Sequence, residues 1–149
     1  MSHRRLFARA LLLGVFVALR TGSASEARAS ITVGEISAPS LEEDVSTLDL
    51  FRFLVEKEIG RLELDRAAKP TSYVFSASLV RLDAHASRDG SMAVCIVSGA
   101  LRRASSGTIV AVMRGTSSVD GDRGALPGTK ARALEVAVHG AVRHVPEAI

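Results

Sequence analysis

The residues YVFSASLVRLDAHASRDGSMAVCIVSGALRRASSGTIVAVMRGT, numbered 73–116, decide the fold of this chain. Aromatic, β-branched and small side chains favour extended backbone in three segments there: 73–83, 92–101 and 108–116. Turn residues separate the segments. Arg88-Asp89-Gly90-Ser91 contains the Asp-Gly pair that hairpins favour, and Ser105-Ser106-Gly107 follows the second segment. The sequence therefore predicts an antiparallel meander of three strands.

The middle segment is apolar at both parities, which favours a central strand. Such a strand is covered on both faces by its own chain, or on one face by its own chain and on the other by a dimer contact. Cys95 lies inside this segment and is expected to be buried as a small apolar side chain. As the only cysteine of the chain, it cannot form an intramolecular disulfide, so the fold must rest on its core.

An amphipathic helix precedes the meander. Ser40 and Glu43 are spaced as a capping box, in which each side chain satisfies a backbone N–H at the other's position. An apolar stripe follows at spacings of three and four: Leu41, Val45, Leu48, Phe51, Val55, Ile59 and Leu62. The helix is expected to end between Gly60 and Pro70.

A short strand and a second helix complete the predicted order. Residues 31–36 alternate as a strand does, and Pro39 ends them. A polar, glycine-rich loop over residues 120–128 leads into a closing helix that stops at Pro146. Its apolar positions are Ala131, Leu134, Val138, Ala141, Val142 and Val145. The order β-α-β-β-β-α predicts an α+β fold, a two-layer sandwich with both helices packed on one face of the meander.

Residues 1–29 have the three parts of a cleavable export signal. His3, Arg4, Arg5 and Arg9 precede an apolar run over residues 10–19, and small residues follow. Ala27-Arg28-Ala29 fits the cleavage site with Ser30 as the new N-terminus, and Ser23-Ala24-Ser25 is the competing site. Ten apolar residues are too few to span a bilayer, which takes about 20. We therefore predict a signal peptide over 1–29, a single small domain over 30–149, no permanent membrane anchor and a periplasmic or secreted location, with the twin-arginine route open because of Arg4-Arg5.

The predicted leader carries most of the basic character of the chain. Five arginines and one glutamate lie in residues 1–29, which leaves 14 basic and 15 acidic side chains in residues 30–149. A near-neutral mature domain offers little attraction to phosphate backbones. A domain of the double-stranded-RNA-binding type shares the helix, three strands, helix order, but Lys130 and Arg132 alone supply little of the lysine cluster that it needs. We predict no nucleic-acid partner.

No familiar catalytic or metal-binding pattern occurs in the sequence. His139 and His144 are five residues apart on the closing helix, so they point about 140° apart and cannot grip one metal ion. Asp120 and Asp122 resemble the start of a calcium loop without its further oxygen ligands. We therefore predict no catalytic, cofactor-binding or metal-binding residues and a chain that is not an enzyme. An exported hydrolase whose site assembles only in the fold, for example a serine with His85 and Asp83, is the alternative.

A meander covered by helices on one face leaves its edges and its other face available to a partner. Tyr73, Phe75 and the pair Arg102-Arg103 are the candidate partner-surface residues. A homodimer through the sheet face or an edge is a second expectation for the same surface.

Three stretches resemble a group of bacterial envelope domains: residues 73–82, residues 100–110 and residues 133–145. The group includes the curli-secretion lipoprotein, the lipoprotein activator of penicillin-binding proteins and the TolB N-terminal domain. The shared pattern is a strand of tyrosine with small and apolar residues, a strand that ends in a Ser/Thr-Gly turn, and a closing alanine-rich helix. It covers about half of the chain, which lacks the lipid-bearing cysteine of several members. The resemblance implies a non-enzymatic periplasmic module that binds a protein or glycan partner.

Overall fold

The computed structural model describes residues 28–39, 45–64 and 71–149. Apart from Arg28 and Ala29, the expected signal peptide lies outside these residues, as do Ser40 and Glu43 of the expected capping box. The elements are β1 (Ser30–Ser37), α1 (Val45–Gly60), β2 (Ser72–Ala86), β3 (Ser91–Arg103), β4 (Ile109–Gly121), α2 (Leu126–Val142) and a 3₁₀ turn (Pro146–Ala148). The predicted order β-α-β-β-β-α is confirmed.

The four strands form one mixed sheet in the order β1-β2-β3-β4. The predicted meander is confirmed, because β2 pairs antiparallel with β3 and β3 pairs antiparallel with β4. β1 pairs parallel with β2, starting with Ser30 opposite Ser72. Parallel neighbours need a crossover connection, and α1 lies within this one.

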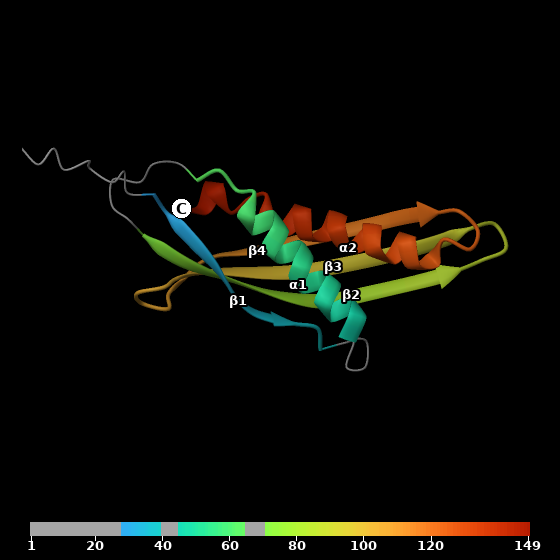
Figure 1. Ribbon diagram of the computed structural model, residues 1–149, viewed down its shortest axis with the longest axis horizontal. Coiled ribbons are helices and arrows are strands. Elements are labelled where there is room, and N and C mark those ends of the chain that lie inside the picture. The colour runs from blue at the N-terminus through green and yellow to red at the C-terminus, as the bar shows by residue number, and fades with distance from the viewer. Residues whose placement is uncertain (1–27, 40–44, 65–70) are drawn as a thin grey trace, which may run out of the picture.

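Both helices lie on one face of the sheet, as predicted, with α1 running obliquely to α2 (Figure 1). Every second residue of β2 and β3 points toward the helices, from Tyr73 to Leu79 and from Ser91 to Leu101. The largest fully buried side chains are Phe51, Phe75, Leu79, Leu101 and Leu134. One continuous core therefore lies between the helices and the sheet.

The helix α2 approaches β4 closely because small residues meet at the contact. A Cβ atom added to Gly115 would lie 1.7 Å from the carbonyl oxygen of Ala137. Two residues along the strand, the hydroxyl of Ser117 donates a hydrogen bond to the carbonyl of Ala133 at 2.6 Å. Only a residue without a side chain fits at position 115, so the packing of α2 depends on it.

The buried stripe of α1 differs from the predicted one at its start. Val45 is 69% exposed, whereas Leu54 and Glu58 are buried beside Phe51 and Val55. At 3.6 residues per turn, Val45 lies about 120° around the helix from Phe51 and so points away from the sheet. The predicted end of this helix between Gly60 and Pro70 is confirmed.

The predicted loop over residues 120–128 is shorter than expected. β4 continues to Gly121 and α2 begins at Leu126, with Pro127 in its first turn, where a proline costs no hydrogen bond. The alternation of exposed and half-buried residues along β4 continues beyond Thr116, because Ser117 and Val119 are half-buried under α2. The extended β4 makes the sheet longer than α1, so α1 covers only part of its length (Figure 1).

Candidate binding surfaces

Within the described residues, neither helix covers the second face of the sheet, which we call the open face. It is formed by the side chains that alternate with the core residues along β2, β3 and β4. Two cross-strand rows run over its centre: Ser76, Ala100 and Val112, and next to it Ser78, Ser98 and Arg114.

The open face carries more exposed apolar side chains than its polar centre suggests. Val112 is 69% exposed, and Met92, Val80 and Ile109 are also exposed. Val80 is the unpaired residue of a bulge between Leu79 and Arg81, which turns its side chain outward. An antiparallel sheet with one solvated face usually alternates apolar and polar residues more strictly. Of the two coverings predicted for the second face of β3, the chain itself or a dimer contact, the described helices do not supply the first, because both lie on the other face (Figure 1).

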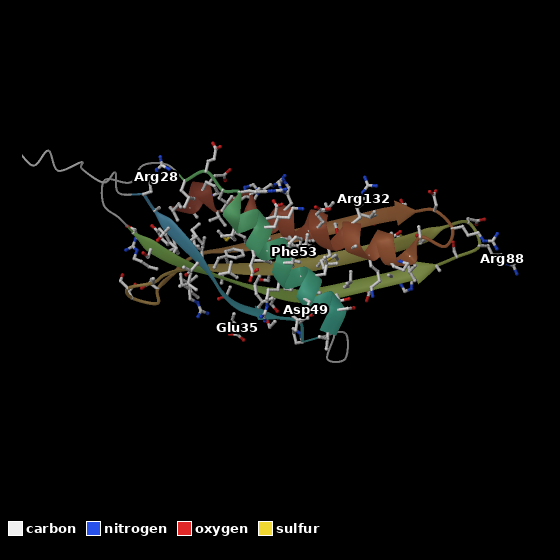
Figure 2. All side chains as sticks on the ribbon, viewed as in Figure 1. Arg28, Glu35, Asp49, Phe53, Arg88 and Arg132 are labelled. Atoms are coloured by element: carbon white, nitrogen blue, oxygen red, sulfur yellow. The ribbon has the colours of Figure 1, made fainter. Side chains whose placement is uncertain are left out.

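A shallow hollow of about 170 Å³ lies in the open face where the side chains are small. Its lining includes four hydroxyls, those of Ser37, Ser76, Ser78 and Ser98, and the hydroxyl of Ser37 donates to that of Ser78 at 3.2 Å. Glu35 lines the hollow from β1, at the edge of the sheet where Figure 2 labels it. Arg114 pairs with Ser98 from the opposite edge strand. Glu35 and Arg114 thus lie on opposite sides of the hollow.

Tyr73 and Phe75 do not lie on this surface, and the prediction that they contribute to it is wrong. Tyr73 is 6% exposed and Phe75 is fully buried, because both point toward the helices. The ring of Phe75 occupies the space above Gly99, where a Cβ atom would come within 2.5 Å of its Cζ atom. The aromatic residues of β2 are therefore part of the core.

Arg102 and Arg103 are exposed at the end of β3. Arg102 pairs with Val74, which places it on the open face. Arg103 lines a separate polar hollow of about 420 Å³ with Thr71, Ser72 and Ser105. The two arginines are thus available at the surface but do not lie in one site.

A charged cluster that the sequence analysis missed joins the two helices. Glu58 of α1 accepts hydrogen bonds from Nδ1 of His139 on α2 at 2.9 Å and from Arg61 at 3.1 Å. Burial by itself raises the pKa of the Glu58 carboxyl, but the hydrogen bond and charge of His139, together with Arg61, outweigh it and hold the pKa below its usual range. Glu58 is three residues from Val55 and seven from Phe51, so it lies on the buried stripe of α1. This spacing is the sequence signal from which the burial of Glu58 could have been predicted.

The proposed hydrolase residues are not assembled. Asp83 forms an ion pair with Arg81, and the His85 side chain is exposed and makes no hydrogen bond to another described side chain. The prediction that the closing helix continues to Pro146 is wrong, because α2 ends at Val142. His144 therefore lies in the turn after α2, where it pairs with Glu147 at 3.2 Å, whereas His139 lies on α2 and pairs with Glu58. Among residues 28–39, 45–64 and 71–149, no three acidic, histidine or cysteine side chains are grouped as metal ligands would be.

Cys95 is fully buried, as predicted. Burial raises the pKa of its thiol to about 12. The reactive thiolate is therefore scarce at neutral pH.

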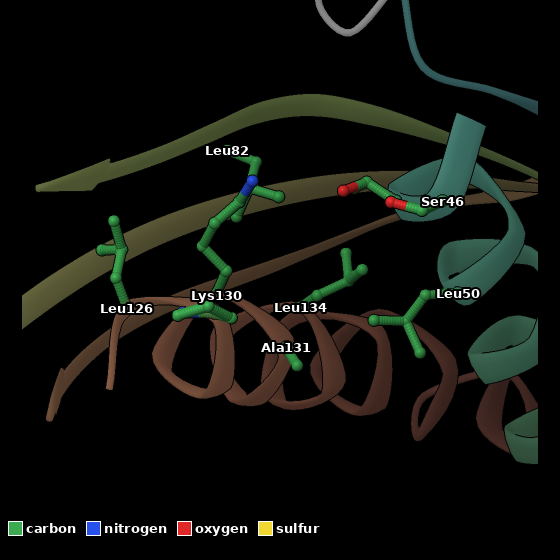
Figure 3. A pocket seen from close by; sticks show the side chains of 9 residues that line it. Ser46, Leu50, Leu82, Leu126, Lys130, Ala131 and Leu134 are labelled. Atoms are coloured by element: carbon green, nitrogen blue, oxygen red, sulfur yellow. The ribbon is translucent and has the colours of Figure 1, made fainter. Parts of the chain in front are cut away.

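A pocket of about 370 Å³ opens on the helix side, between the first turns of α1 and α2 and above β2 (Figure 3). Most of its wall is aliphatic and comes from Leu50, Leu82, Leu126, Pro127, Ala131 and Leu134. Ser46, Thr47 and Lys130 supply its polar groups. It exists because α1 does not cover the second half of β2, where Leu82 and Ala84 are only half-buried.

Neither of the two described helices is long and apolar enough to cross a membrane.

The sequence matches no protein-family model and no curated protein. Solved structures of similar arrangement include a candidate lipoprotein of Caulobacter crescentus, 19% identical, with a TM-score of 0.45 over 75% of this chain and 85% of that one. The PelC dodecamer of Paraburkholderia phytofirmans is 16% identical, with a TM-score of 0.43 over 76% of this chain and 88% of that one. A minor lipoprotein of Acinetobacter baumannii is 6% identical, with a TM-score of 0.40 over 82% of this chain and 91% of that one. Lipoproteins thus occur among the neighbours, the three families named from the sequence are not confirmed, and at this level of similarity the neighbours say nothing about function.

Proposed function

We propose that this chain is an exported, non-enzymatic envelope module that binds a protein partner through the open face of its sheet. The observation that carries the proposal is the exposure of Val112 and Ile109 near one end of a sheet face that neither described helix covers, with Met92 exposed toward the other end. Apolar residues gathered on one face are typical of protein contacts, whereas single exposed apolar residues are ordinary. Export rests on the three-part pattern of residues 1–29.

A protein fits this face better than a glycan does. Sugar rings are commonly bound by stacking on aromatic side chains, and the aromatic residues of β2 point into the core. The open face instead offers valine, isoleucine and methionine beside Glu35 and Arg114, which suits a surface with its own apolar and charged groups. A second copy of this chain is one such partner, because it would bring Arg114 to meet Glu35.

The test is photo-crosslinking in the producing cell from two matched positions. A photoreactive residue at Val112 on the open face should give one discrete crosslinked band, whereas the same residue at Val136 should not. Val136 is the control because it is also an exposed valine, at 46%, but lies on the outer side of α2. Equal crosslinking from both positions, or none from either, contradicts the proposal.

A substitution then measures the contribution of the surface. Val112→Asp should weaken capture of the crosslinked protein about ten-fold or more, since an unpaired charge at the centre of an apolar contact is costly. Val136→Asp should leave capture unchanged. Charge reversal tests the two arginines at the end of β3. We expect a smaller loss of capture for Arg102 than for Val112, and none for Arg103, which lies in the separate hollow. The mass of the crosslinked band distinguishes a second copy from a different protein.

Export is tested separately, by the N-terminal sequence of the recovered protein. The protein recovered from the periplasm or the medium should begin near Ser30. An intact Met1 on protein found in the cytosol would contradict it.

A further inference from the structure

The pocket on the helix side combines an aliphatic wall with one cationic side chain. Leu126, Lys130 and Leu134 follow one another at intervals of four residues, so they form one stripe along α2. The stripe covers about 12 Å at a rise of 1.5 Å per residue. Leu82 faces it from β2 and Leu50 faces it from α1 (Figure 3). The space is thus a slot with aliphatic sides, and its described lining contains no aromatic ring.

Lys130 lies within this slot and not beyond it. Its side chain is only partly exposed, and the N-terminus of α2 lies one turn away. No side chain caps that helix end, so the positive end of its dipole adds to the charge of Lys130. A lysine ammonium has three N–H donors, so it can bind an anion and keep its other contacts.

The α2 wall of the slot is held in place by contacts within the fold. Thr129, adjacent to Lys130, places its hydroxyl 2.8 Å from that of Ser91 on β3 and also donates to the carbonyl of Ala125 at 3.0 Å. Gly121 leaves the room for this contact, because a Cβ atom there would lie 2.1 Å from the Thr129 hydroxyl. A wall held in place costs little ordering entropy when a ligand binds.

We propose that this slot binds a single straight acyl chain with an anionic end, of the class of the medium-chain carboxylates. The carboxylate lies at Lys130, in the middle of the stripe, and the acyl chain extends from there between Leu134 of α2 and Leu50 of α1 (Figure 3). This inference is independent of the proposed function, because the slot and the open face are on opposite sides of the sheet. The volume of about 370 Å³ is at the lower end of ligand pockets, which suits one chain and not a two-chain lipid.

The test is calorimetric titration of the protein recovered after expression with hexanoate, octanoate, decanoate and dodecanoate, each below the concentration at which it forms micelles. The affinity should rise about four-fold with each added methylene, and the rise should stop once the slot is full. A rise that continues through the whole series, or heat that never saturates, indicates non-specific partition and overturns the proposal.

Two variants separate the contribution of the charge in the slot from that of its apolar wall. Lys130→Gln should weaken decanoate about five-fold or more and leave decanol unchanged, because only the carboxylate loses its partner. Arg132→Gln is the matched control, since Arg132 is an exposed cation two residues away that does not line the slot. An equal effect of both substitutions would mean general attraction to a basic surface and would overturn the assignment.

Filling the slot provides an independent check. Ala131→Phe should abolish the binding of decanoate and decanol alike. Circular dichroism and a cooperative melt verify that this variant is folded, and Leu82→Asn on the opposite wall replaces it if it is not. Binding that survives in a folded variant of either kind places the ligand elsewhere and excludes the slot.

Discussion

At the scale of single residues, most side chains that could take part in a reaction are buried or paired. The thiol, the buried carboxylate and the histidines are the groups that a search for a reaction would examine first. The thiol and the carboxylate are held by packing or by a partner, and His139 and His144 each pair with a glutamate, whereas His85 is exposed. Cys95 faces the core from the central strand, and Glu58 is shared by His139 and Arg61.

Cys95 should resist alkylation in the native protein. With its pKa raised to about 12 and its side chain fully buried, the thiolate is scarce and inaccessible at neutral pH. Iodoacetamide at pH 8 should therefore modify less than about a tenth of the molecules in the time that labels all of them in denaturant, as read by intact mass. Rapid native labelling would show that β3 opens locally.

Glu58 should make stability depend on pH in the acid range. Its pKa is lowered on folding, so its stabilising contribution is complete above the unfolded value of about 4.3 and is lost as the pH falls through the lower folded value. Glu58→Gln should cost about 1 kcal/mol of unfolding free energy at pH 7 and less at pH 3, as measured by urea denaturation.

The matched control for this carboxylate is Glu135→Gln. Glu135 also pairs across the two helices, with Lys57 at 3.1 Å, but its side chain is 49% exposed. An exposed pair contributes little, so this variant should change stability by less than about 0.5 kcal/mol at either pH. A pH effect as large as that of Glu58→Gln would show that burial is not the deciding factor.

At the scale of elements, the contact between α2 and β4 depends on the absence of a side chain at one position. Gly115→Ala should destabilise the protein by about 2–3 kcal/mol, because the added Cβ atom meets the backbone of Ala137 and the helix must move away. Thermal unfolding followed by circular dichroism measures the loss.

Gly128→Ala is the control for this substitution. No atom of a neighbouring residue lies within 4 Å of a Cβ atom placed there, and the residue is in the first turns of α2. Alanine is a better helix former than glycine, so this change should be neutral or stabilise by up to about 1 kcal/mol. If both glycine variants lose stability equally, the helix itself and not its docking is responsible.

The type and order of the elements followed from the sequence because each carries a clear period. The three strands of the meander contain β-branched residues with glycine-containing turns between them, and both helices show apolar spacings of three and four. The parallel pairing of β1 could not be predicted, since a short strand pairs in either direction and the choice depends on the distant crossover. The burial of Tyr73 and Phe75 depends on which parity of β2 faces the helices, and residue type alone does not decide that. The pocket arises where α1 is too short to cover β2, which is a property of the assembled layers.

For the whole molecule, stability rests on one core without a covalent crosslink. The sequence has a single cysteine, and it is buried. The melting temperature should therefore be the same, within about 1 °C, with and without a reducing agent. A lower melting temperature under reducing conditions would show that Cys95 joins two chains by a disulfide, and non-reducing electrophoresis would identify the crosslinked product.

The parallel pairing of β1 with β2 also determines the order in which the sheet can assemble. β2 and β3 close over the four residues between Ala86 and Ser91, whereas β1 meets β2 only after the 34 residues between Ser37 and Ser72, and closing a longer loop costs more entropy. During synthesis β1 is made before β2, so it has no strand to pair with until β2 has also been made. The earliest strand to be synthesised is thus expected to be the last to join the sheet, and until then the outer edge of β2 is open to any other strand that reaches it.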